Sequence, residues 1–166
     1  MTSLNSAFDR VLLACAIFAA GIFGATAVLI SVNVVLRNLG AATIYGLLDA
    51  VEYGLLAATF LAAPWVLSQK AHVSVDLVTS VLRPATSRRL SRAVSLTGFT
   101  VSLVFLRYAV EAAWRSAERG SMIRTAFTIP EWWVLAIAPV AFVLICIEFL
   151  RQAAHPDERA EKASGL

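Results

Sequence analysis

Residues that build catalytic or metal sites are scarce in this sequence. Among 166 residues there are two cysteines and two histidines, and the two cysteines lie far apart. Zinc sites and disulfide frameworks normally show clustered or paired cysteines, so Cys15 and Cys146 are most simply buried thiols inside apolar runs. No nucleophile with its base, no phosphate-binding loop and no zinc motif is present. The sequence therefore predicts neither an enzyme nor a metal or cofactor site.

The same scarcity argues against a haem held between membrane helices. Such a haem needs an axial ligand, for example His or Met, that projects into the helical core. His72 lies at the end of an apolar run, and His155 lies near the carboxyl terminus. Met1 and Met122 both fall outside the apolar runs. A membrane anchor subunit of a redox complex is kept as an alternative from another functional class.

Charge is scarce too, because only 15% of the residues are charged whereas 59% are hydrophobic. Soluble domains contain about 45–50% apolar residues, so this excess indicates a membrane protein. The net charge of +3 falls in the gaps between apolar runs instead of on one continuous surface. This distribution is typical of a membrane topology signal and does not predict a nucleic-acid partner.

A chain of this length has room for four spans of about 20 residues, the length that crosses a hydrocarbon core about 30 Å thick. We expect one all-α membrane domain over residues 1–166, with spans at about 11–36, 47–69, 90–117 and 129–150 and a charged tail at 152–166. The uncharged run from Val11 to Leu36 is longer than the core of a signal peptide, so it is expected to be a span. Pro139 predicts a kink in the fourth span.

The polar stretch after the second span predicts a short amphipathic helix in the membrane interface, at about residues 72–83. The alternation there would also fit a strand, but an isolated strand would leave its edges unpaired. Trp65, Lys70, His72 and Asp76 are expected to anchor this region at the interface. His72 and Asp76, four residues apart, form an acid/base pair or half a metal site in the alternative interpretation, although a third ligand is missing.

Basic residues predict the orientation of the chain, because they are enriched in cytoplasmic loops. Nine of them fall on the side of the two termini, namely Arg10, Lys70, Arg83, Arg88, Arg89, Arg92, Arg151, Arg159 and Lys162. Four fall on the opposite side, namely Arg37, Arg115, Arg119 and Arg124. We therefore expect both termini and the His72 region to be cytoplasmic.

Four charged residues are predicted at a similar depth near the outer face, when positions are counted along the helices. They are Arg37, Glu52, Arg107 and Glu111. Ionisable residues inside a membrane are costly in lipid and usually face a partner. We expect a structural layer that locks the helices together, and the alternative is an ion or substrate path.

The chain lacks features that a self-sufficient secondary transporter usually shows. It has no evident internal repeat and no pair of Gly- or Pro-broken helices in corresponding halves. Four helices also leave little space for a gated pathway. The sequence therefore favours a subunit of a larger complex, with a stand-alone small carrier or channel as the alternative.

Short motifs follow one another along the sequence: Val35-Leu36-Arg37, Glu52, Trp65 followed by His72-Val73-Ser74-Val75-Asp76, and Ile129-Pro130-Glu131-Trp132 leading to Pro139-Val140. In this order and spacing they resemble the small permease subunit of tripartite ATP-independent periplasmic (TRAP) transporters. The resemblance covers about Val28 to Leu150. The acidic pair that often opens the second helix of this family is spread out here as Asp49 and Glu52.

The resemblance implies a multi-pass subunit of the bacterial inner membrane that packs against a large permease subunit. The large subunit would carry the substrate and sodium sites, and a soluble periplasmic binding protein would deliver an organic acid. The small subunit would then act as a scaffold and offer part of the outer docking surface, at Asn38–Leu47 and Arg115–Thr128. Within that surface, Arg115, Arg119 and Arg124 are expected to meet acidic residues of the binding protein.

Overall fold

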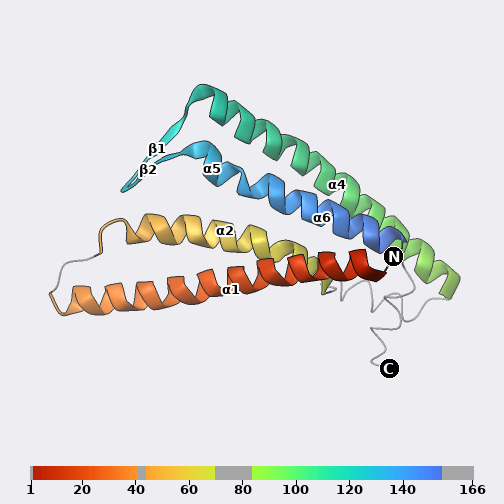
Figure 1. The fold of residues 1–166 in the computed structure, drawn as a ribbon, viewed down its shortest axis with the longest axis horizontal. Helices are drawn as coiled ribbons and strands as arrows, with labels where there is room; N and C mark the ends of the chain where they lie inside the picture. Colours follow the sequence, from red (N-terminus) through yellow and green to blue (C-terminus); the bar gives the residue numbers. More distant parts are fainter. Residues whose placement is uncertain (1, 41–43, 70–83, 155–166) are drawn as a thin grey trace.

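The computed structural model describes residues 2–40, 44–69 and 84–154 (Figure 1). Five helices and two strands occupy them: α1 (Thr2–Asn38), α2 (Leu47–Ser68), α4 (Pro84–Arg119), β1 (Met122–Arg124), β2 (Thr128–Pro130), α5 (Glu131–Leu135) and α6 (Ile137–Ala154). The interfacial helix predicted at residues 72–83 lies outside the described residues, and so does most of the predicted tail.

Four described segments are long and apolar enough to cross a membrane, namely Asn5–Asn38, Leu47–Ser68, Arg89–Arg119 and Glu131–Ala154. The prediction of an all-α membrane protein with four spans is therefore confirmed. Two helices begin earlier than their apolar runs indicate, because α1 starts at Thr2 and α4 starts at Pro84. Polar and charged residues at the ends of a span can continue the helical hydrogen bonding beyond its apolar part.

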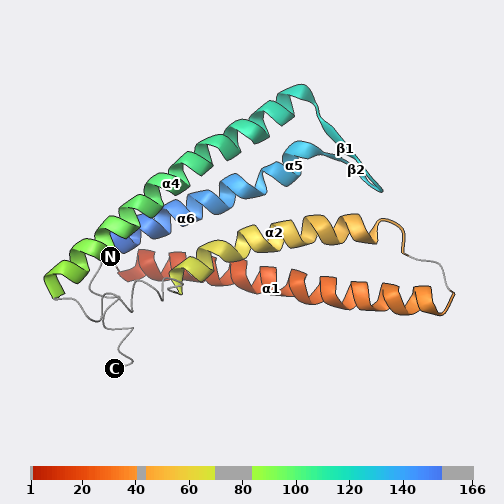
Figure 2. The same cartoon turned by 180° about the vertical axis from the view of Figure 1, so that it is seen from behind.

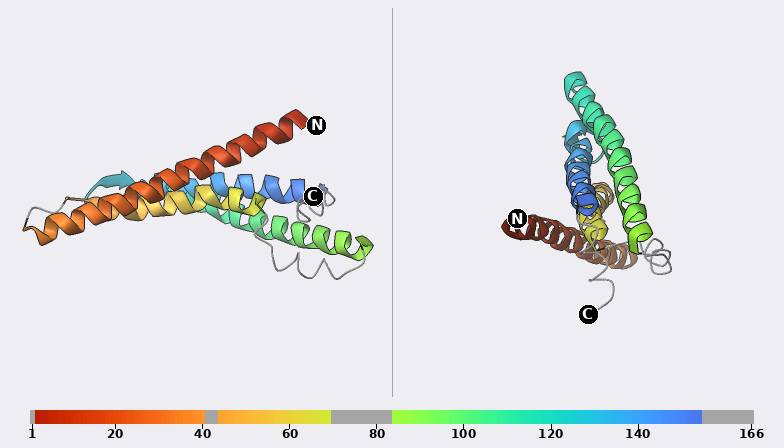
Figure 3. Two further views of the ribbon diagram at one scale, coloured as in Figure 1. Left: turned by 90° about the horizontal axis from the view of Figure 1, so that it is seen from below. Right: turned by 90° about the vertical axis from the view of Figure 1, so that its right-hand side faces the viewer.

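The four long helices lie in the order α4, α6, α2, α1 across the molecule (Figures 1 and 2). α1 packs along α2, α4 packs along α6, and α2 also contacts α6. The α1–α2 pair and the α4–α6 pair diverge toward one end, so the molecule has the shape of a V (Figure 2). Viewed along its long axis, α2 and α6 lie between α1 and α4 (Figure 3).

The V has a terminal end and a hairpin end. At the terminal end, where the pairs converge, α1 and α4 begin and α2 and α6 end (Figure 1). At the hairpin end, where the pairs diverge, α1 and α4 end, α2 begins, and β1 and β2 form a two-stranded antiparallel hairpin. All the polar contacts described below belong to one or the other end.

Small residues form the contacts between the helices. Ala19, Ala58 and Ala141 are each almost completely buried, on α1, α2 and α6 respectively. A Cβ atom at Gly98 would collide with the ring of Phe149, so α4 and α6 are closely packed where this glycine faces that ring. Small residues are expected at such contacts because lipid supplies no hydrophobic drive between helices, and association depends on close packing.

Pro139 accounts for the interruption between α5 and α6. A proline has no N–H, so the carbonyl of Leu135, four residues earlier, loses its intrahelical donor. The helix breaks at Ala136, one residue after Leu135, while the Ala136 N–H still donates to the Trp132 carbonyl at 2.9 Å. The kink predicted from the sequence is thus present as a short break in the fourth span.

The β-hairpin lies between the third and fourth predicted spans, where the sequence predicted no strands, and β2 extends past the predicted start of the fourth span at residue 129. α4 ends at Arg119, and Gly120 turns the chain with a left-handed φ of 62°. Ile123 then pairs with Ile129 in the hairpin register. Pro130 keeps an extended backbone, which delays the start of the helix to Glu131.

Candidate functional site

Of the four charged residues predicted to form one layer, Arg107 and Glu111 pair with each other, and no ion pair among the described residues joins them to Arg37 or Glu52. Arg107 pairs with Glu111 at 3.2 Å, and Arg115 also pairs with Glu111, so these three side chains follow one face of α4. Arg37 and Glu52 are exposed and form no ion pair among the described residues. The physical reason is the V shape, because α1 and α2 diverge from α4 toward the hairpin end where these residues lie.

The Arg107–Glu111 pair lies on an outward surface of α4. The Arg107 side chain is 74% exposed and the Glu111 side chain is 28% exposed. Arg107 precedes the last residue of α4 by 12 positions, which corresponds to about 18 Å of helix. An arginine exposed at this depth of a candidate span would be costly in lipid unless another protein covers it.

The three arginines predicted to dock a partner lie at the hairpin end but differ in how they are paired. Arg115 is bound to Glu111. Arg119, in the last turn of α4, and Arg124, in β1, are exposed and form no ion pair among the described residues. Arg119 and Arg124 are therefore the two of the three whose charge is open to a partner.

The tip of the β-hairpin rests on the first turn of α2. The Ala126 N–H donates to the Asp49 carboxylate at 2.7 Å, across 77 positions of the sequence. Gly46 precedes α2 with a left-handed φ of 73°, and a Cβ atom there would lie 2.6 Å from the Phe127 ring. One charge-assisted hydrogen bond and one aromatic contact thus join the hairpin to α2.

The stem of the hairpin is held by α4 and by the start of α5. The Ser116 hydroxyl donates to the Glu131 carboxylate at 2.7 Å, and Ser116 is completely buried. The Glu131 N–H donates to the Ser121 carbonyl at 3.0 Å. The hairpin therefore spans the open end of the V, with its stem on the α4–α6 pair and its tip on the α1–α2 pair (Figure 1).

At the terminal end, Arg151 of α6 joins the first and last helices. Its guanidinium pairs with Asp9 of α1 and lies 5.5 Å from the centre of the Phe8 ring. Its Nε also lies 3.2 Å from a carboxylate oxygen of Glu148, whose side chain is only 2% exposed. A buried carboxylate needs such compensation because removing a charge from water costs several kcal/mol.

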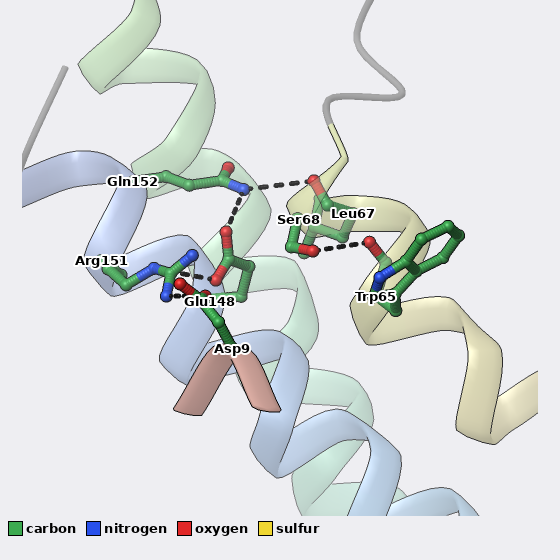
Figure 4. A network of polar contacts seen from close by, with 7 residues as sticks. All are labelled: Asp9, Trp65, Leu67, Ser68, Glu148, Arg151 and Gln152. Carbon is green, nitrogen blue, oxygen red and sulfur yellow. Dashed lines mark hydrogen bonds and ion pairs between the residues drawn. The ribbon is translucent and has the colours of Figure 1, made fainter. Parts of the chain in front are cut away.

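Gln152 extends this network to α2. Its amide nitrogen donates to Glu148 at 2.8 Å and to the Leu67 carbonyl at 3.3 Å. Figure 4 shows Arg151 between Glu148 and Asp9, with the Gln152 amide reaching toward the end of α2. Side chains of α6 therefore contact α1 and α2 in one network that closes the narrow end of the V.

From the sequence, Arg151 counts only among the basic residues that predict the orientation of the chain, and Glu148 has no predicted role. The signal that was available is their spacing with Gln152, because residues three and four apart lie on one face of a helix. The sequence did not reveal their partners, since Asp9 and Leu67 belong to distant parts of the chain.

Of the four predicted interfacial anchors, Trp65 is the one that lies among the described residues. Trp65 is half-buried in the last turn of α2, and its carbonyl accepts hydrogen bonds from Ser68 and Gln69. Lys70, His72 and Asp76 lie outside the described residues. Within the residues that the structure describes, no group of three or more His, Cys, Asp or Glu side chains is arranged to hold a metal ion.

One family model matches most of the chain. It is that of the DctQ component of tripartite ATP-independent periplasmic transporters, and it covers residues 26–159. The matched range includes every site residue predicted from the sequence, whereas Phe8 and Asp9 precede it. No curated protein matches the chain.

Proposed function

The chain belongs to the family of the DctQ component of tripartite ATP-independent periplasmic transporters, and from this premise we propose that it scaffolds the large permease subunit in the bacterial inner membrane. The resemblance noted in the sequence is confirmed, and the chain is a small membrane component of such a transporter. We further propose that both termini face the cytoplasm and that the complex takes up an organic acid with sodium. No catalytic role is proposed.

The observation that carries the scaffold role is the exposed Arg107, which is paired with the half-buried Glu111. Arg107 and Glu52 both lie on candidate spans, and this chain leaves both of them exposed. Covering them with polar groups of another subunit would remove the cost of exposing them to lipid. The predicted charge layer, including Arg37, is accordingly proposed to be completed by the large subunit and not within this chain.

Binding to the large subunit is tested by co-purification of tagged Arg107→Ala with that subunit. The expected result is a clear loss of the co-purified partner and a matching loss of uptake in reconstituted vesicles. Arg92→Ala is the matched control, because Arg92 is also exposed on α4 but lies near its other end. If Arg107→Ala co-purified normally and uptake still failed, the scaffold role of Arg107 would be refuted in favour of a direct path role.

The hairpin end is proposed as the part that helps dock the periplasmic binding protein. Arg119 and Arg124 supply exposed positive charge there, and Arg115 contributes less because Glu111 already pairs with it. Electrostatic complementarity of this kind mainly raises the association rate and weakens with salt. Trp65, Lys70, His72 and Asp76 are proposed to anchor the opposite side of the subunit in the membrane interface.

Docking is tested by the affinity of the binding protein for the assembled permease at low and high salt. Changing both Arg119 and Arg124 to Glu should weaken binding at low salt about tenfold or more, with a smaller effect at high salt. Arg92→Glu changes a charge at the terminal end and should have no effect. If the unchanged protein, the double variant and Arg92→Glu all bound the partner equally well at low salt, Arg119 and Arg124 would not dock the partner.

A further inference from the structure

The β-hairpin is the described connection that bridges the open end of the V. Along the helices, the α1–α2 pair meets the α4–α6 pair mainly where α2 contacts α6. At the hairpin end, the contacts from Ala126 and Phe127 to the start of α2 cross the gap between the pairs. The position of the hairpin, and of Arg124 within it, therefore depends on both pairs.

The stem alone does not fix the tip. The stem is tied to α4 and α5 through the Ser116–Glu131 and Glu131–Ser121 hydrogen bonds. The strands are three residues each, and a short two-stranded hairpin has little stability by itself. The tip thus needs contacts of its own to hold one orientation. Among the described residues, these are the contacts of Ala126 with Asp49 and of Phe127 with Gly46.

Asp49 and Gly46 are suited to this task for different reasons. Asp49 is the third residue of α2, where a carboxylate is also favoured by the helix dipole, so its acceptor is pre-oriented. Gly46 leaves the space that the Phe127 ring occupies, and its φ of 73° suits glycine better than any other residue. Glu52, one turn further along α2, forms no such contact with the hairpin among the described residues.

We propose that Asp49 and Gly46 are positioning residues that hold the hairpin across the open end of the V, so that Arg119 and Arg124 form one fixed docking surface with the start of α2. This inference rests on the proposed docking function. It gives Asp49, the acidic residue of α2 that faces the hairpin, a role that the exposed Glu52 does not share. Arg124 acts on the partner, whereas Asp49 acts on Arg124 through the hairpin.

The first measurement follows hydrogen–deuterium exchange of the backbone amides of residues 122–129 in the assembled permease. In Asp49→Ala the Ala126 N–H loses its acceptor, so exchange should become roughly tenfold faster. Asp49→Asn keeps a neutral acceptor and should show a smaller increase. Phe127→Ala removes the aromatic contact without straining Gly46 and should also increase exchange. Asp9→Asn is the matched control, because it removes an exposed carboxylate at the terminal end, and it should leave the exchange of these amides unchanged.

The second measurement is the affinity of the binding protein for the same assembled variants. If the hairpin is docked for only about a third of the time in Asp49→Ala, the apparent affinity should fall about threefold. Rescue toward the original affinity by Asp49→Asn would support a role for the hydrogen bond. Asp9→Asn should bind like the unchanged protein.

The two measurements together support or refute the positioning role of Asp49 and Gly46. Faster exchange together with weaker binding supports the positioning role. Unchanged exchange in Asp49→Ala overturns it, whatever the affinity does, and so does faster exchange with unchanged affinity. Failure of the docking function itself is recognised separately, because changing Arg119 and Arg124 to Glu would then leave affinity unchanged while the exchange of residues 122–129 still reported whether Asp49 holds the hairpin.

Discussion

Replacing Arg151 by Gln should destabilise the subunit strongly, because it removes the cation beside a buried carboxylate. Glu148 is 2% exposed, and Arg151 is 25% exposed at 3.2 Å from it. Breaking a buried ion pair by removing one partner costs about 3–5 kcal/mol. Gln152 would still donate to Glu148, so we expect the lower end, about 3 kcal/mol.

This loss is large enough to measure by thermal unfolding of the purified subunit. For a chain of this size, 1 kcal/mol corresponds to about 2–4 °C, so Tm should fall by about 6–12 °C. The control is Asp9→Asn, which removes the other carboxylate that pairs with Arg151. The Asp9 side chain is 55% exposed, so its loss should cost no more than about 1 kcal/mol.

A double variant makes the prediction stricter. Glu148→Gln combined with Arg151→Gln removes both charges and leaves no buried ion, so it should be more stable than Arg151→Gln alone. Two results would refute the reasoning. Either Arg151→Gln costs no more than Asp9→Asn, or the double variant is no more stable than the single one. Each would mean that Glu148 does not depend on Arg151 for its charge.

Two further changes test how the helices pack and bend. Gly98→Ala places a methyl group against the Phe149 ring and should cost about 1–3 kcal/mol in thermal unfolding, whereas Gly21→Ala, with nothing within 4 Å, should be neutral or slightly stabilising. Pro139→Ala restores an N–H for the Leu135 carbonyl and should slow amide exchange around the α5–α6 break; unchanged exchange would assign the break to another cause.

The four spans could be predicted from the sequence because each is a long apolar run between charged residues. The kink near Pro139 could also be predicted, since it follows from one missing N–H. The β-hairpin could not be predicted. Met122–Arg124 and Thr128–Pro130 are only three residues each, too short to show a strand period, and their pairing depends on the turn between them.

The candidate site shows a second limit on what can be predicted from the sequence, namely the direction in which a charged side chain faces. Counting residues along a helix gives the depth of Glu52 and Arg107, but it does not give the direction in which their helices diverge. Two residues at one depth can therefore face different sides of a V. The burial of Glu148 is the converse case. Charges at the end of a span are usually exposed, but Glu148 is buried beside Arg151, which pairs with Asp9 of α1, and Gln152, which bonds to Leu67 of α2.

The bond between Asp9 and Arg151 joins residues that are 142 positions apart, close to the two extremes of the described chain. During synthesis, Asp9 leaves the ribosome long before Arg151 exists, so the first helix must wait in the membrane without its partner. Completion of the last helix then closes the network and buries Glu148. A chain that stops before α6 would leave Asp9 without Arg151 and the terminal end unclosed, and chaperones and proteases act on incompletely folded chains of this kind.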